Sequence, residues 1–258
     1  IPFLNAKDTS SLDGPWGADL HGRLYASAVT FKLSANTRPP SDPRGATTRP
    51  VGPDSATIGV TLPDSNLIVR FDPRILNSPR TRIGRVRTAS TGKQETKVIG
   101  QKITVIQSFP LFLPADAWTV FPDGRVAIVR GANYHVEFIA VDGRRSAPVT
   151  IPYEHFKLTE ADRKIEMDAV HKQLGEQKAA ISKLAPPGYT IEIEMTPPAE
   201  WPAEYPPISL LGVLAAPDGR LWVKRSVPER IGREQWDVID QNGKLVSRWQ
   251  LPPKITLV

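Results

Sequence analysis

Cysteine is absent from the sequence. Its absence excludes disulfide bonds, thiolate nucleophiles, iron–sulfur clusters and zinc sites that depend on cysteine ligands. A protein of the cell envelope that avoids oxidisable thiols would have this composition, but cytosolic proteins can lack cysteine as well. The absence therefore restricts the chemistry of the chain more than its location.

Long hydrophobic runs are also missing. The longest apolar stretches, such as residues 208–216, are too short and too interrupted for a transmembrane helix, and no signal peptide is visible. Hydrophobic residues still make up 40% of the 258 residues, enough for a sizeable core, so we expect a single domain over residues 1–258. Because the chain begins with Ile-Pro and not with Met, we also expect that upstream residues were removed, which could have included a leader or an anchor.

Motifs for catalysis and metal binding are lacking too. There is no His-Glu-x-x-His motif, no Gly-x-Ser-x-Gly motif and no complete phosphate-binding loop around Gly92-Lys93. No two of the four histidines have the spacing of metal ligands: His21, His135, His155 and His171. Four aspartates recur at or near predicted turns, where an aspartate bonds its own backbone: Asp123, Asp142, Asp218 and Asp240. The sequence therefore predicts no catalytic residue, no metal ligand and no cofactor.

Positive charge is concentrated in one part of the chain, whose overall net charge is +6. Residues 70–102 contain nine Lys or Arg residues against Asp72 and Glu95, a net charge of +7, so the rest is close to neutral. This charge is typical of a solvated strand face, and it also suits a contact surface for an acidic partner or lipid headgroups. Nucleic acid is disfavoured, because no aromatic residue lies between Phe71 and Phe109 to stack on bases.

A second basic segment is rich in proline. Residues 37–53 contain five prolines and three arginines. Because proline removes donors that a sheet needs, we expect an exposed arm, either disordered or in contact with a partner. The candidate protein-binding residues come from this arm, from the strand predicted over residues 81–88 and from the residue just before that strand: Arg38, Arg44, Arg49, Arg80, Arg82, Arg85 and Arg87.

The most regular pattern lies in residues 118–145. Apolar and polar residues alternate around Val126 and Ile128, and a more continuously apolar run follows over residues 136–141. Each run is bounded by an Asp-Gly pair, which suits a tight turn because glycine accepts a positive φ. The pattern predicts two consecutive β-hairpins, which together form a four-stranded antiparallel sheet.

This pattern recurs near the C-terminus. The segment PDGRLWV at 217–223 matches PDGRVAI at 122–128, and QWDVIDQNGK at 235–244 matches HVEFIAVDGR at 135–144. A looser copy occupies residues 16–27, with a turn at His21-Gly22. One such sheet cannot bury both of its faces, so repeated sheets favour a β-propeller, in which neighbouring blades cover each other. Three tryptophans fall on strand positions expected to pack between blades: Trp118, Trp222 and Trp236.

Further strands and two insertions are predicted around these repeats. Strands are expected over residues 65–72, 81–88, 97–112 and 189–195, with 81–88 as an edge strand that exposes its arginines. Residues 159–184 predict an inserted amphipathic helix capped by Thr159. Its apolar stripe consists of Ile165, Val170, Leu174, Ile181 and Leu184. The residues expected to face water are Glu166, Lys172, Glu176 and Lys183. Residues 196–207 hold five prolines around Trp201 and Tyr205, which predicts a stiff strap pinned by these two rings.

Taken in order, these motifs resemble a known family. The aromatic residue before PDGR, the strand ending in Asp-Gly, the helix begun by threonine, and the final YPP, PDGRLWV and WDV-x-D-x-x-G segments look like the C-terminal half of six-bladed, NHL/TolB-like bacterial β-propellers. The resemblance covers residues 118–252 well and residues 16–88 loosely. It implies four-stranded blades, an exported or envelope location and usually no assigned catalysis. The chain accounts for about three blades plus strands for a fourth, so the propeller is either incomplete or contains blades too degenerate to see.

Two functions follow from these expectations. The first is a non-catalytic binding or scaffolding propeller, periplasmic or otherwise extracytoplasmic, which binds a protein as an accessory subunit of a larger envelope or membrane-associated complex. The alternative is a propeller-type metal-dependent hydrolase or lactonase with its site in the central channel, because some six-bladed relatives bind a metal there through Glu, Asn and Asp residues of different blades. The exposed basic and proline-rich segments favour the first.

Overall fold

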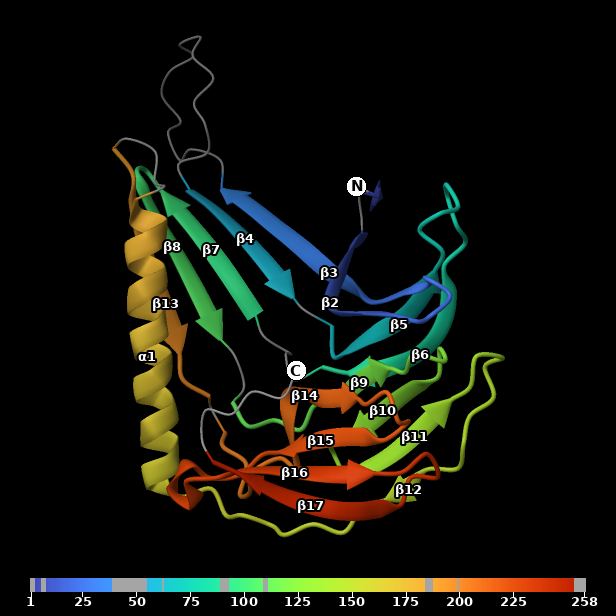
Figure 1. Cartoon of the computed structure of the whole chain (residues 1–258). Helices are drawn as coiled ribbons and strands as arrows, with labels where there is room; N and C mark the ends of the chain where they lie inside the picture. The colour runs from blue at the N-terminus through green and yellow to red at the C-terminus, as the bar shows by residue number, and fades with distance from the viewer. Residues whose placement is uncertain are drawn as a thin grey trace, which may run out of the picture.

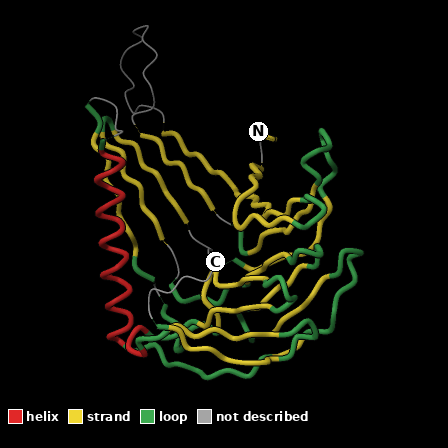
Figure 2. Tube along the Cα trace, viewed as in Figure 1, coloured by secondary structure: helices red, strands yellow, loops and turns green. Residues whose placement is uncertain are grey.

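The computed structural model describes residues 3–5, 8–38, 55–61, 63–88, 93–108, 111–183, 188–198 and 200–252. These residues form three β-sheets and a single long α-helix, so the prediction of an all-β fold is confirmed (Figures 1 and 2). One sheet has nine strands and two have four, and none of them closes on itself within the described residues.

The second unit, as we call the β9–β12 sheet, is the predicted pair of hairpins. Its antiparallel strands follow the order β12-β11-β10-β9, with these bounds: β9 Ala117–Val120, β10 Val126–Arg130, β11 His135–Ile139 and β12 Val149–Thr150. Gly124 and Gly143 adopt φ values of 87° and 88° in the turns after β9 and β11. The Asp-Gly pairs therefore lie at tight turns, as the sequence predicts.

The third unit, the β14–β17 sheet, repeats this topology. Its strands run in sequence order: β14 Ile208–Ala215, β15 Leu221–Arg225, β16 Glu234–Ile239 and β17 Leu245–Leu251, with a short 3-10 helix at Glu229–Ile231. The matching segments occupy matching places, since β10 corresponds to β15 and β11 to β16. The sequence repeat therefore marks a repeated four-stranded antiparallel sheet.

The first unit is part of the nine-stranded sheet. Here β2 Asp8–Ala18 pairs with the first half of β3 Leu24–Arg38, which pairs with β5 Ser65–Phe71, and β5 pairs with β6 Thr81–Arg87. A further short strand, β1 Phe3–Asn5, pairs with β2. The looser copy at residues 16–27 thus forms the β2–β3 hairpin of the first unit, which is also four-stranded and antiparallel.

The rest of the nine-stranded sheet forms a wing beside the three units (Figure 1). The second half of β3 pairs with β4 Ser55–Thr61, and the sheet continues through β7 Lys93–Ile99 and β8 Lys102–Ser108 to β13 Thr190–Thr196. The predicted strand pair at 97–112 is therefore not part of a fourth separate blade. The wing also takes in Thr37 and Arg38, which the sequence places in the exposed arm but which end β3; residues 39–53 of that arm lie outside the described residues.

Two hydrophobic cores hold the units face to face. One contains Tyr25, Ile68 and Val86 of the first unit with Trp118, Val126, Ile128 and Ile139 of the second. The other contains Ala127, Val129, Val136 and Phe138 of the second unit with Val213, Leu221, Val223 and Ile239 of the third. Alternate residues of β10 enter opposite cores, so both faces of this strand are buried, and burial of apolar side chains is the main stabilising contribution.

The tryptophan positions are only partly as predicted. Trp118 lies between two units, and its Nε1 donates a hydrogen bond to Ser27 Oγ at 3.2 Å. Trp222 and Trp236 lie on β15 and β16, but cross-strand pairing places them on the face of the third unit that no described sheet covers. The reason is the period of two along a strand, which puts their neighbours Leu221, Val223 and Asp237 on the inner face.

Helix α1, Glu160–Ser182, matches the predicted helix and packs against β13 (Figure 2). Thr159 and Asp162 form a capping box at its start. The predicted apolar stripe is partly wrong: Val170 and Leu174 lie toward the sheet, but Ile165 and Ile181 are exposed, and Leu184 lies outside the described residues. Glu166, predicted to face water, is instead half-buried, because α1 contacts the narrow edge of the wing and not a broad sheet face.

The proline-rich strap runs beside residues 155–158. The Leu158 amide donates to Ala203 O at 2.9 Å, and the Tyr205 amide donates to Phe156 O at 2.9 Å. Phe112 contacts both aromatic rings of the strap, with centroid distances of 6.2 Å to Trp201 and 5.0 Å to Tyr205. These contacts place the strap where α1, the third unit and the loop before β9 meet.

Candidate functional site

The candidate arginines are split by the structure. Arg82, Arg85 and Arg87 lie on β6, and we call these three arginines the basic edge; Arg80 directly precedes the strand. Arg38 ends β3 in the wing, away from β6 in the sheet order. Arg44 and Arg49 lie outside the described residues.

Strand β6 is an edge strand, as predicted, since it pairs only with β5 among the described strands. Ile68 and Gly84 pair with each other and face the core. Neighbouring residues of a strand point to opposite faces, so the next pairs, Leu67 with Arg85 and Val69 with Arg82, lie on the outer face of the first unit. All three β6 arginines are exposed. Arginines on an edge strand block unwanted strand pairing and leave guanidinium groups free to bind a carboxylate.

Carboxylates behind the basic edge are already occupied. Asp116 accepts hydrogen bonds from the Arg87 amide at 2.8 Å and from Arg130 Nη1 at 2.7 Å, and Arg130 Nε donates to Glu137 at 2.7 Å. Partial burial would raise the pKa of the Glu137 carboxyl, but the hydrogen bond from Arg130 outweighs burial and holds that pKa below its usual value. Within the described residues, no carboxylate forms an ion pair with Arg82, Arg85 or Arg87. The positive charge of the basic edge is therefore available to a partner.

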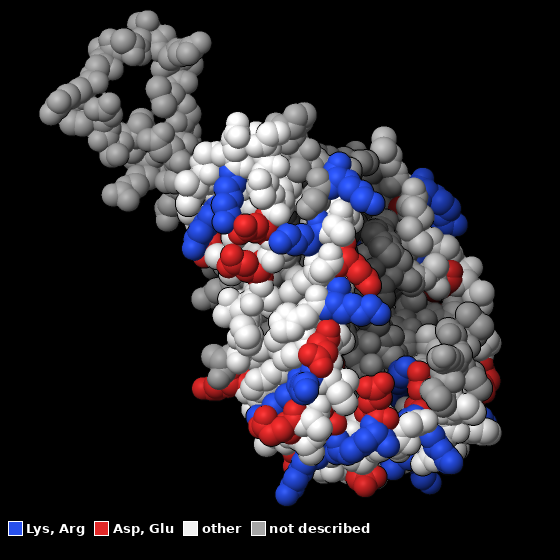
Figure 3. All heavy atoms as spheres, turned by 90° about the vertical axis from the view of Figure 1, so that its left-hand side faces the viewer, with Lys and Arg blue, Asp and Glu red and all other residues white. Residues whose placement is uncertain are grey.

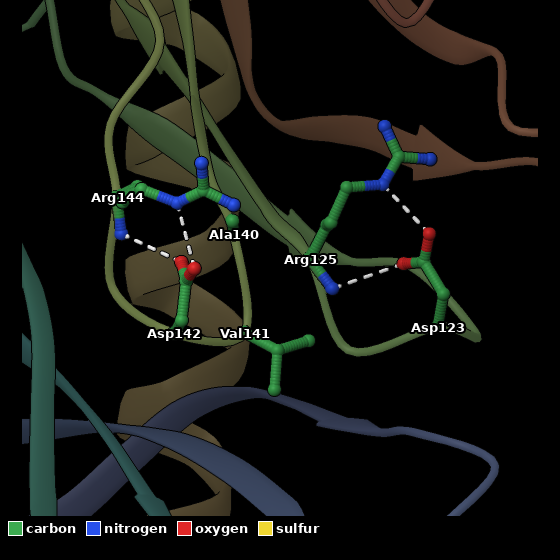
Figure 4. Close-up of a pocket in the computed structure, with 6 residues that line it drawn as sticks. All are labelled: Asp123, Arg125, Ala140, Val141, Asp142 and Arg144. Carbon is green, nitrogen blue, oxygen red and sulfur yellow. Dashed lines mark hydrogen bonds and ion pairs between the residues drawn. The ribbon is translucent and has the colours of Figure 1, made fainter.

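A shallow pocket of about 500 Å³ lies at the turns of the second unit (Figure 4). Its lining includes two aspartates and two arginines, one of each from each turn. Each arginine contacts the aspartate of its own turn: Arg125 Nε donates to Asp123 Oδ2, and Arg144 Nε donates to Asp142 Oδ2, both at 2.7 Å. The backbone and side chain of Arg144 hold the pKa of the Asp142 carboxyl below its usual value. Both carboxylates are therefore ionised and neutralised within their own turns.

The same turn occurs in all three units. In the first, Asp19 Oδ1 accepts the amides of His21 and Arg23; in the third, Asp218 accepts the Arg220 amide, and Asp240 accepts the amides of Asn242 and Lys244. The turns also touch across units, because the Leu20 amide donates to Pro122 O at 2.8 Å and the Tyr25 hydroxyl to Gly124 O at 3.1 Å. The recurring aspartates thus stabilise turns, as the sequence predicts.

A deeper groove of about 440 Å³ lies between α1 and the wing. Apolar and amide side chains line it together with one carboxyl group: Gln107, Leu111, Glu166, Val170, Gln173, Leu174, Gln177 and Met195. Burial, and secondarily the charge of Glu229, raise the pKa of the Glu166 carboxyl. Around this groove, the face that carries α1 mixes acidic and basic side chains (Figure 3), which contrasts with the single sign of the basic edge.

Polar contacts fix the start of α1. Asp162 accepts hydrogen bonds from the Thr159 amide at 2.9 Å and the Thr159 hydroxyl at 2.6 Å, and Arg230 Nη1 donates to its Oδ1 at 2.6 Å. Burial alone would raise the pKa of the Asp162 carboxyl, but these donors outweigh it and lower that pKa to about 2. This network ties the helix to the short 3-10 segment of the third unit.

The histidines are scattered. His21 lies in the first turn, His171 is exposed on α1, His135 contacts Asn133 and Glu137, and His155 contacts Glu204. In the part of the chain that the structure describes, no three His, Cys, Asp or Glu side chains lie together as a metal site requires. The described helices also include none that is long and apolar enough to span a membrane.

Sequence analysis missed the groove and the outer face of the third unit. The groove depends on the parallel pairing of β13 with β8, which joins segments about 90 residues apart and leaves no local pattern. The outer face has a signal in the sequence, since Trp222, Trp236 and Trp249 lie on three consecutive predicted strands. We compared the chain with family models, with curated proteins and with solved structures, and none of the three comparisons finds a match.

Proposed function

We propose that this chain is a non-catalytic binding or scaffolding protein of the β-propeller type, which acts outside the cytoplasm as an accessory subunit of a larger envelope or membrane-associated assembly. Three four-stranded antiparallel units packed face to face support the propeller. The first strands of the units support it as well, because β9 lies beside both β14 and β2. Such a stack offers rigid outer surfaces on which partners can dock.

The observation that carries this proposal is the basic edge. Arg82, Arg85 and Arg87 are exposed on an edge strand of a rigid sheet, and within the described residues no carboxylate pairs with them. Charge held in this way favours association with a complementary surface and increases the rate of encounter. We also propose that Arg44 and Arg49 of the Pro/Arg-rich arm, which lie outside the described residues, contact this partner.

The hydrolase alternative has less support. It requires carboxylate and amide ligands from different units to converge, whereas the turn carboxylates Asp123, Asp142 and Asp218 each accept hydrogen bonds within their own turn.

The test is purification of the tagged full chain from its native cells after chemical crosslinking, with crosslinked peptides mapped by mass spectrometry. We expect crosslinks or protected arginines at the basic edge, and we expect the variant Arg82→Glu/Arg85→Glu/Arg87→Glu to lose the associated protein. A matched control reverses the same number of charges on exposed positions of α1: Lys164→Glu/Lys172→Glu/Lys178→Glu.

The control should retain the partner. Equal loss in both triple variants would mean that net charge matters and not the basic edge. Recovery of an unattached chain from native cells would contradict the scaffolding function.

A further inference from the structure

The outer face of the third unit is unusually aromatic. Cross-strand pairs place Lys224, Trp236 and Trp249 in one row of this face, and Leu214, Trp222 and Val238 in the next. We call these six residues the tryptophan face. No described sheet or helix packs on it.

Only part of the tryptophan face is open to solvent. Trp249 is 52% exposed, and its ring lies 6.3 Å from that of the half-buried Trp222, whereas Trp236 and Val238 are buried, at 5% and 0% exposed. Exposed aromatic side chains of this kind are typical of a surface that another protein covers.

The opposite end of the stack has a complementary surface. The outer face of the first unit carries Leu67, Val69 and Phe71 on β5, beside Arg82 and Arg85 on β6. The chain already stabilises guanidinium groups over aromatic rings: Arg125 lies 4.7 Å from the Phe121 centroid, and Arg163 lies 5.7 Å from that of Trp201. Arginines of a second copy facing these tryptophans would form the same type of contact.

We propose that a second copy of this chain covers the tryptophan face with the outer face of its first unit. Contact between the two ends continues the face-to-face packing that already joins the three units within one chain. Because the two faces are different surfaces, a two-fold axis would make the contact twice. This inference rests on the proposed function, since it names the partner that docks on the basic edge.

The first measurement is the mass of the full chain by light scattering and sedimentation velocity over a range of concentrations. We expect a dimer, and we expect Trp249→Glu to weaken dimerisation at least tenfold, since a charge there would be buried against the partner. The matched control is Ile99→Glu on β7 of the wing, a position that is 62% exposed and belongs to neither end of the stack. This control should dimerise as the wild type does.

A mixing experiment tests which surfaces meet. Trp249→Glu damages one end of the stack, and Arg82→Glu/Arg85→Glu damages the other, so each variant alone should be monomeric. Mixed together, they retain one intact contact, between the tryptophan face of the arginine variant and the basic face of the tryptophan variant. The mixture should form a heterodimer weaker than the wild-type dimer, which also shows that both variants are folded.

The remaining outcomes overturn the inference. A monomeric wild type, species larger than a dimer, or a mixture that stays monomeric would each contradict the two-fold dimer. Dimers that resist Arg82→Glu/Arg85→Glu would place the partner elsewhere. A monomeric chain whose basic-edge variant loses a different protein in native cells would contradict this inference and leave the proposed function standing. A monomeric chain whose basic-edge variant keeps that protein would contradict both.

Discussion

Arg225 Nη1 lies 3.7 Å from Asp237 Oδ2 in the core between the second and third units, where the two residues are 2% and 0% exposed. The guanidinium also lies 5.3 Å and 5.1 Å from the ring centroids of Tyr134 and Tyr153. Asp237 in turn accepts hydrogen bonds from the Tyr134 hydroxyl at 2.7 Å and from Arg248 Nε at 2.6 Å. A buried charge network therefore crosses the interface between two repeats.

Removing the carboxylate from this network should be costly. We expect Asp237→Asn to lower the free energy of unfolding by about 3 kcal/mol, because Arg225 would stay buried without a nearby counter-charge. Chemical denaturation measures this, with the exposed Asp168→Asn on α1 as a control expected within about 0.5 kcal/mol of wild type. In a double-mutant cycle with Arg225→Met, the combined loss should be smaller than the sum of the single losses; additive losses would mean that the two charges do not interact.

Acid should destabilise the chain partly through Asp162. Its folded pKa of about 2 lies below the ordinary aspartate value of 3.8, so the ionised form stabilises the fold. This stabilisation, about 2 kcal/mol, is complete above the unfolded pKa and is lost as the pH falls from about 4 to 2. We expect Asp162→Asn to be less stable at pH 7 and to show a shallower loss of stability over that pH range in thermal melts. Identical pH profiles for the variant and wild type would refute this role.

Glu166 should behave in the opposite way. Burial and Glu229 raise the pKa of its carboxyl, so the ionised form is disfavoured in the folded chain. The fold is therefore destabilised by this residue above its folded pKa, and this effect disappears as the pH falls below the unfolded value. We expect Glu166→Gln to raise the melting temperature at pH 7 and to have no effect near pH 4, whereas the exposed Glu176→Gln should change neither.

Two turn glycines provide a matched pair of substitutions. Gly124 and Gly143 have φ values of 87° and 88°, so alanine is strained at both by about 1 kcal/mol. A Cβ at Gly143 meets nothing within 4 Å, but a Cβ at Gly124 would lie 2.9 Å from Arg23 Nη2 and 3.0 Å from Asp19 Oδ2. We therefore expect Gly124→Ala to lower the unfolding free energy more than Gly143→Ala. Equal losses would show that the turns of the first and second units do not pack tightly.

The turns and the repeated sheets could be predicted because their signals are local. Asp123-Gly124 and Asp142-Gly143 determine tight turns within a few residues, and the copies at residues 217–223 and 235–244 do the same. The capping box of Thr159 and Asp162 is equally local. The alternation along residues 81–88 likewise predicts the exposed arginines of the edge strand β6.

The wing could not be predicted, because its pairings are not local. Nothing near residues 24–38 indicates that β3 spans both the first unit and the wing of the nine-stranded sheet, and the parallel contact of β13 with β8 depends on the whole chain. The predicted apolar stripe of α1 is partly wrong for a related reason. Periodicity places Ile165 and Ile181 on the apolar side of α1, but the narrow surface offered by β13 covers only the middle of that side.

The sharing of β3 has a mechanical consequence. Its residues 24–28 pair with β5, and its residues 32–38 pair with β4, so a single uninterrupted backbone joins the first unit to the wing. A pull on α1 or β13 would reach β3 through the hydrogen-bonded strands β8, β7 and β4, and the continuous backbone of β3 would carry it into the first unit. A partner bound at the basic edge and one bound at the wing would therefore be mechanically coupled through β3.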